Sequence, residues 1–160
     1  MIDASTAHDA LLTVHVIAGT AGLALGPIAM LLPKRRGMHP RVGLVYQAVL
    51  AALTVSALGL AMLDFDQLWW LALIAVGTEV AALAGWRAAR QRRTGWLPRH
   101  VGLMCGSYVS LVTALLVVSW DSPLAWILPT VIGSPLIARA RARASRQSPG
   151  RIDEALPVGS

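Results

Sequence analysis

Long apolar runs with almost no charge are the feature that most constrains this chain, because a soluble domain of this size could not bury them. The chain of 160 residues is 56% hydrophobic and only 14% charged, whereas about a quarter of the residues in a soluble domain are charged. A helix needs about 20 apolar residues to cross the hydrocarbon core of a bilayer, and most of the runs reach that length. The sequence therefore predicts an all-α integral membrane helical bundle.

Five transmembrane helices follow from the positions of the runs. We expect them at about residues 10–32, 42–63, 67–86, 100–120 and 124–138. The fifth run is the shortest, and Pro129 and Pro135 interrupt it, so a short crossing, a broken helix and a re-entrant segment all remain open. Residues 1–140 would form one transmembrane domain. Residues 141–160, rich in Arg, Ser, Pro and Gly, are expected to form a disordered basic cytoplasmic tail.

The placement of charge predicts the orientation. All 14 Lys and Arg residues lie in three segments, at 34–41, 87–99 and 139–151. The opposite ends of the runs carry Asp and no basic residue. The positive-inside rule then puts the N-terminus outside and the C-terminus in the cytoplasm, as a multi-pass protein of the cell inner (cytoplasmic) membrane. The net charge of +6 does not indicate nucleic acid, because the basic residues are not interleaved with aromatics along a groove.

A short motif occurs twice. The segments 39–46 and 99–108 each place a His and an Arg next to a Val-Gly-Leu step, and each opens a long apolar run. Both would mark the cytoplasmic start of a membrane helix. The two copies have the same predicted orientation, which indicates a parallel repeat of two helices each rather than an inverted one.

The second copy resembles the C-terminal motif of a family of predicted bacterial membrane proteins, domain of unknown function 2306. The shared residues are His100, Met104, Ser107 and Tyr108. The family often has Arg where this chain has Val101 and Gly106, which puts any anion-binding role of those arginines in doubt. The resemblance implies a multi-span bacterial membrane protein and carries no activity with it.

His39 and His100 are the first candidate site, because both are expected at the same depth on neighbouring helices. Two neutral imidazoles in that arrangement can ligate the iron of haem b from its two faces, or another metal. The alternative is that they bind lipid phosphates or loop carbonyls. Met104 lies on the same helix face as His100, and its thioether would suit copper in the Cu(I) state; the alternative is that it fills an apolar gap. His15 is expected near the outer boundary, too far away to take part.

Glu79 is the second candidate, as the one acidic residue inside a predicted span. An acid in hydrocarbon is a functional hypothesis by default. We expect it to be neutral and hydrogen-bonded to Tyr108 or Ser107. Glu79, Tyr108 and His100 would then form a polar line from mid-membrane to the cytoplasm, either as a proton relay or as a static contact that sets the helix register.

Three functions compete at this stage. The lack of a nucleophile, base and acid set favours a non-enzymatic membrane or accessory protein. His39 and His100 favour a haem- or metal-binding membrane redox protein, and Glu79 favours a small proton-coupled permease. The expected partners are the lipid bilayer and a second copy or a membrane-complex partner, without nucleic acid.

Overall fold

Five helices make up almost all of the part of the chain that the structure, a computed structural model, describes, which is residues 3–34 and 37–147. In chain order they are α1 (Ala4–Leu31), α2 (Met38–Leu63), α3 (Phe65–Gln91), α4 (Trp96–Ser119) and α5 (Leu124–Arg146). No strand occurs within these ranges. The prediction of an all-α bundle is confirmed.

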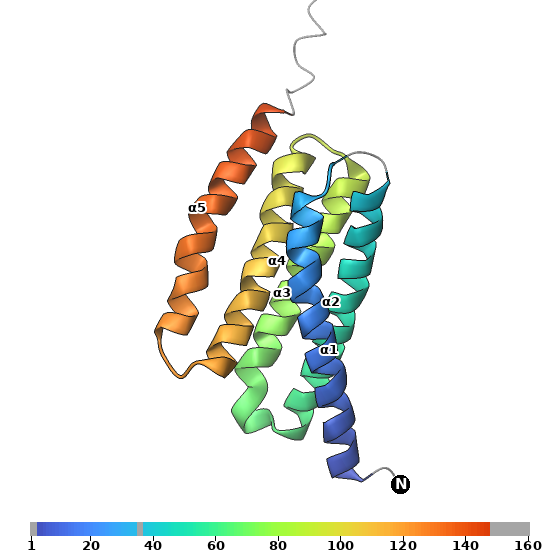
Figure 1. The fold of residues 1–160 in the computed structure, drawn as a ribbon, viewed down its shortest axis with the longest axis vertical. Helices are drawn as coiled ribbons and strands as arrows, with labels where there is room; N and C mark the ends of the chain where they lie inside the picture. Colours follow the sequence, from blue (N-terminus) through green and yellow to red (C-terminus); the bar gives the residue numbers. More distant parts are fainter. Residues whose placement is uncertain (1–2, 35–36, 148–160) are drawn as a thin grey trace, which may run out of the picture.

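Successive helices run in opposite directions along the long axis of the molecule (Figure 1). The first four close into a bundle in which α1 contacts α2 and α4, while α3 contacts α2 and α4. The helix α5 packs mainly on α4, touches α3 through the rings of Trp126 and Trp70, and lies at the edge of the bundle. A single residue, Asp64, separates α2 from α3. So short a connection makes α2 and α3 antiparallel neighbours.

Four of the helices, α1 to α4, are long and apolar enough to cross a membrane. Large apolar side chains such as Ile17, Val55 and Met62 point outward and are 65%, 67% and 82% exposed. An exterior of this kind fits lipid rather than water. The helix α5, with 23 residues, is long enough but is not among the helices apolar enough to cross, so a fifth crossing stays a prediction. Pro129 and Pro135 lie inside α5 and do not end it.

Each of the helices α1 to α4 contributes at least one side chain to the core. It contains Ala18, Tyr46, Leu50, Leu53, Ala82 and Leu111. Small residues let the helices approach: a Cβ on Gly22 would lie 3.2 Å from Leu111 Cδ2, and one on Gly26 would collide with the ring of Tyr108. By contrast, Gly77 has no atom near its missing Cβ, because α3 turns Thr78, Ala82 and Gly85 inward instead.

The C-terminal boundary of α5 differs from expectation. The helix continues through Arg146, so residues 141–146 are helical and not part of a disordered tail. Alternating Ala and Arg have high helix propensity, and the Arg141 side chain packs over Gly102 of α4. Residues 148–160, the rest of the expected tail, lie outside the described residues.

Candidate functional site

The two copies of the repeated motif place their histidines in the same way. His39 lies in the first turn of α2 and His100 lies near the start of α4, at the end of the bundle where α1 and α3 finish (Figure 1). His39 Nδ1 is 3.0 Å from Ala29 O, and His100 Nδ1 is 2.9 Å from Gly85 O. Each histidine therefore binds a backbone carbonyl of the preceding helix, which is close to the carbonyl-binding alternative to a metal site. This shared contact supports the predicted parallel repeat of α1–α2 and α3–α4.

The carbonyl that His39 binds is available for a reason visible in the sequence. In an α-helix the carbonyl of Ala29 would accept from the N–H of residue 33, but residue 33 is Pro33, which has no N–H. The His39 ring donates to this orphan carbonyl instead. The Lys34 Nζ also donates to Ala29 O at 3.1 Å, and it reaches Met30 O as well. Both side chains thus satisfy the open C-terminal carbonyls of α1.

His100 can reach the carbonyl of residue 85 because that residue is a glycine. A Cβ on Gly85 would lie 3.0 Å from Met104 Sδ and 3.1 Å from Leu103 Cβ. The absence of that Cβ lets α4 approach α3 closely enough for the His100 ring to reach Gly85 O. Met104, expected as a metal ligand or a filler of an apolar gap, lies with its sulfur against Gly85 and packs on the core.

The two imidazole rings lie side by side. Their centroids are 6.3 Å apart and their planes are inclined at 84°. The Trp96 ring lies 6.5 Å from the His100 ring. A carbonyl oxygen only accepts, so each Nδ1 must carry the proton, and the lone pair of each ring is then on Nε2. No described residue hydrogen-bonds either Nε2. The two histidines are thus brought together at one depth, as the sequence predicts.

The set of possible metal-binding side chains around His39 and His100 is small. No group of three or more His, Cys, Asp or Glu side chains within residues 3–34 and 37–147 is arranged to hold a metal ion. The nearby cation is Lys34, which lies outside the membrane-spanning segments. Its burial lowers the pKa of the Lys34 ammonium, while the Cys105 side chain acts in the opposite direction.

The predicted contact between Glu79 and Tyr108 is wrong. Gln47 Nε2 of α2 donates to Glu79 Oε1 at 2.7 Å. The Tyr108 hydroxyl donates to Leu23 O of α1 at 3.2 Å, with its ring over Gly26. The reason is direction: Glu79 faces α2, whereas Tyr108 faces α1.

The other proposed partner of Glu79 is also engaged elsewhere. Ser107 is fully buried, and its Oγ donates to Met104 O one turn back in α4, at 2.8 Å. The polar line from Glu79 through Tyr108 to His100 therefore does not form. A small proton-coupled permease built on that line loses its geometric support.

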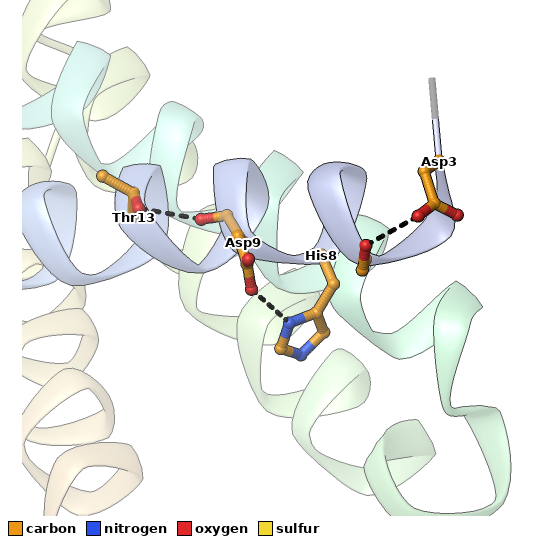
Figure 2. Close-up of polar contacts among 5 residues, drawn as sticks. Asp3, His8, Asp9 and Thr13 are labelled. Carbon is orange, nitrogen blue, oxygen red and sulfur yellow. Dashed lines mark hydrogen bonds and ion pairs between the residues drawn. The ribbon is translucent and has the colours of Figure 1, made fainter. Parts of the chain in front are cut away.

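The opposite end of the bundle carries acidic and hydroxyl groups. In the first turns of α1, His8 Nδ1 lies 3.4 Å from Asp9 Oδ1, Ser5 Oγ donates to Asp3 Oδ2 at 3.0 Å, and Thr13 Oγ1 donates to Asp9 O at 2.8 Å (Figure 2). All of these contacts are exposed and local. They satisfy polar groups in the first turns of α1 and converge on no common point.

His15 lies apart from the His39–His100 pair, as expected. Its Nδ1 is 3.2 Å from Ser56 Oγ of α2. This contact joins α1 to α2 away from the His39–His100 pair, and it makes His15 a matched control for the other two histidines.

The residue that sequence reasoning missed is Gln47. It is 8% exposed and supplies the partner of Glu79. A signal was present, because Gln47 is the one amide side chain well inside any of the predicted spans. An amide in hydrocarbon needs a polar partner as much as an acid does, so the two residues are natural candidates for each other.

No known protein family, curated protein or solved structure matches this chain. Membership of domain of unknown function 2306 therefore stays a prediction.

Proposed function

We propose that the protein is a membrane protein that binds a redox-active metal centre, haem iron first among the candidates, between His39 and His100. The observation that carries the proposal is the pairing of the two rings, 6.3 Å apart, with both Nδ1 atoms held by backbone carbonyls. Histidines that ligate metals commonly donate their other ring nitrogen to a carbonyl or carboxylate, which fixes the tautomer and the ring direction. Both rings meet that condition here.

The spacing of the rings suits one shared metal. Metal–imidazole bonds are about 2 Å long and each ring centroid lies about 1 Å behind its nitrogen, so a metal between two Nε2 atoms in line separates the centroids by about 6 Å. The observed separation is 6.3 Å. The separation matches that value, and a shared metal further requires both Nε2 atoms to point at it.

The number of protein ligands selects among metals. A structural zinc site takes four protein ligands, and no such cluster occurs among the described side chains. Haem iron receives four nitrogens from the porphyrin and needs two axial ligands, which His39 and His100 would supply. Cu(I) is the alternative centre, because it accepts imidazole with a soft thioether such as that of Met104.

The proposal takes the haem- or metal-binding redox protein, the second of the three competing functions, and this function requires no catalytic residues. A one-electron carrier needs a bound centre and a partner to exchange electrons with, but no nucleophile or general base. The basic end of the bundle, where the pair lies, would face the cytoplasm under the positive-inside rule. We therefore propose a multi-pass protein of the inner membrane that exchanges electrons with a membrane or cytoplasmic partner.

The test compares three histidine variants. Protein purified from cells supplied with iron, haem precursor and copper is examined by absorption spectroscopy and by metal analysis. The wild type should show a Soret band, His39→Ala and His100→Ala should each lose it, and His15→Ala should keep it. Helix content and gel-filtration profile serve as the control for folding. If the protein contained copper and showed no Soret band, the bound centre would be Cu(I) rather than haem. A wild type without metal or chromophore would overturn the proposal.

A further inference from the structure

A part-buried polar pair joins α2 and α3. Gln47 Nε2 donates to Glu79 Oε1 at 2.7 Å. Glu79 lies close to the midpoint of α3, about 20 Å from either end of this helix of 27 residues at 1.5 Å per residue. The pair therefore sits at mid-membrane depth.

Two atoms of this pair lack a partner. Glu79 Oε2 and Gln47 Oε1 are both buried, and neither makes a hydrogen bond within the part of the chain that the structure describes, although the buried Thr54 of α2 lies beside the Glu79 carboxyl. An unsatisfied polar atom in hydrocarbon costs several kcal/mol. Both atoms belong to planar head groups that already share one hydrogen bond. A single hydrogen on Glu79 Oε2, donated to Gln47 Oε1, would satisfy both atoms at once.

No charge compensates an ionised Glu79. The one ion-pair contact among the described residues is His8 with Asp9, at the start of α1. The titratable side chains that lie with Glu79 around Tyr46 are Cys105 and Tyr108, and all three neighbours of Glu79 in this group are uncharged at pH 7 in their ordinary forms. A buried carboxylate without a partner is costly. The electrostatics thus agree with the hydrogen-bond count.

We propose that Glu79 and Gln47 form a proton-binding site in the middle of the membrane, in which a carboxylic acid and an amide close a ring of two hydrogen bonds between α2 and α3. The ligand is one proton, held at Glu79 Oε2. Tyr46 of α2 is 2% exposed, and its hydroxyl also has no hydrogen-bond partner among the described residues. It is a third buried polar atom beside Glu79 Oε2 and Gln47 Oε1. The site is independent of the metal proposed between His39 and His100.

The first test uses a hydrophobic carbodiimide on the full protein in membranes at pH 7. A protonated carboxyl adds across a C=N bond of the reagent: its proton moves to nitrogen and its oxygen bonds to the central carbon. The adduct then rearranges to a stable N-acylurea. Peptide mass spectrometry should find the label on Glu79, and Glu79→Gln should lose it. A water-soluble carbodiimide, which does not enter hydrocarbon, should leave Glu79 unlabelled.

The second test is infrared spectroscopy, which detects the proton without a reagent. The wild type should show the C=O band of a protonated carboxyl, and Glu79→Gln should lose that band. Gln47→Leu should shift the band to the higher frequency of a carboxyl that has lost its hydrogen bonds, because the amide partner is gone. Gel filtration and helix content establish that each variant is folded.

Two outcomes would overturn the assignment. A folded wild type with neither label nor protonated-carboxyl band at pH 7 would mean that Glu79 is ionised. Protection of Glu79 from the carbodiimide by sodium, but not by the same concentration of choline, would mean that a metal cation occupies the oxygens of Glu79 and Gln47 in place of the proton.

Discussion

A methyl group added at Gly26 should weaken the contact between α1 and α4. A Cβ at this position would collide with the ring of Tyr108. The ring has little freedom to tilt away, because its hydroxyl donates to Leu23 O of the same helix α1 at 3.2 Å. Gly26→Ala must therefore displace the ring, the hydroxyl or the whole of α1.

Three contributions set the expected change in the free energy of unfolding of Gly26→Ala. Overpacking a filled interior costs about 1–3 kcal/mol. Loss of the hydrogen bond from Tyr108 to Leu23 costs about 0.6 kcal/mol, the average for hydrogen bonds between membrane helices. The higher helix propensity of Ala over Gly offsets about 1 kcal/mol. The free energy of unfolding should thus fall by about 0.6–2.6 kcal/mol.

Reversible unfolding in mixed micelles measures this change, with helix content followed as the fraction of denaturing detergent rises. The matched control is Gly77→Ala, since no atom lies within 4 Å of a Cβ at that helical position. Gly77→Ala should be neutral or stabilising by up to about 1 kcal/mol. In the double variant Gly26→Ala/Tyr108→Leu part of the loss should be recovered. If Gly26→Ala were as stable as Gly77→Ala, close packing of Gly26 on Tyr108 would be refuted.

Three further predictions concern orientation, chemistry and helix docking. A reporter fused after Ser160 should be active only in the cytoplasm, and activity outside would contradict five crossings with the N-terminus out. Lys34, the one lysine of the sequence, should react with an amine reagent with a pH midpoint below that of a lysine peptide, because burial lowers its pKa; an equal midpoint would count against this. Gly133→Leu should loosen α5 and speed its proteolysis, since even a Cβ there would lie 2.6 Å from Val109 Cγ2. Gly106→Ala, with nothing within 4 Å, should not.

The paired histidines show how much of the candidate site a local sequence motif predicts. The repeat of His and Arg before Val-Gly-Leu predicts that His39 and His100 share a depth, and the structure brings their rings to 6.3 Å. The carbonyls that orient them belong to α1 and α3, at Ala29 and Gly85. The free carbonyl of Ala29 can be predicted from the sequence, because Pro33 lacks the N–H that would bind it. The contact with the Gly85 carbonyl cannot, because it depends on how closely α4 approaches Gly85.

Glu79 shows where sequence reasoning stops. Its depth and its need for a neutral partner follow from the sequence, because hydrocarbon penalises an unpaired charge at any position. The partner does not, since Tyr108 and Gln47 both lie near its depth. Only the rotation of α3 about its own axis decides that Glu79 faces α2.

The sequence by itself determined the helical membrane class, four of the spans within a few residues, their antiparallel order and the separation of basic from acidic ends. These features depend on hydropathy, helix length and turn length, all of which are local. The tertiary structure decided which face of each helix is buried, so that Gly26 and Gly85 are packed while Gly77 is exposed. It also decided that Tyr108 binds α1 and that α5 continues through Arg146. The physical reason is that a nearly uniform apolar helix has no strong preferred face, so its rotation is set by contacts with its neighbours.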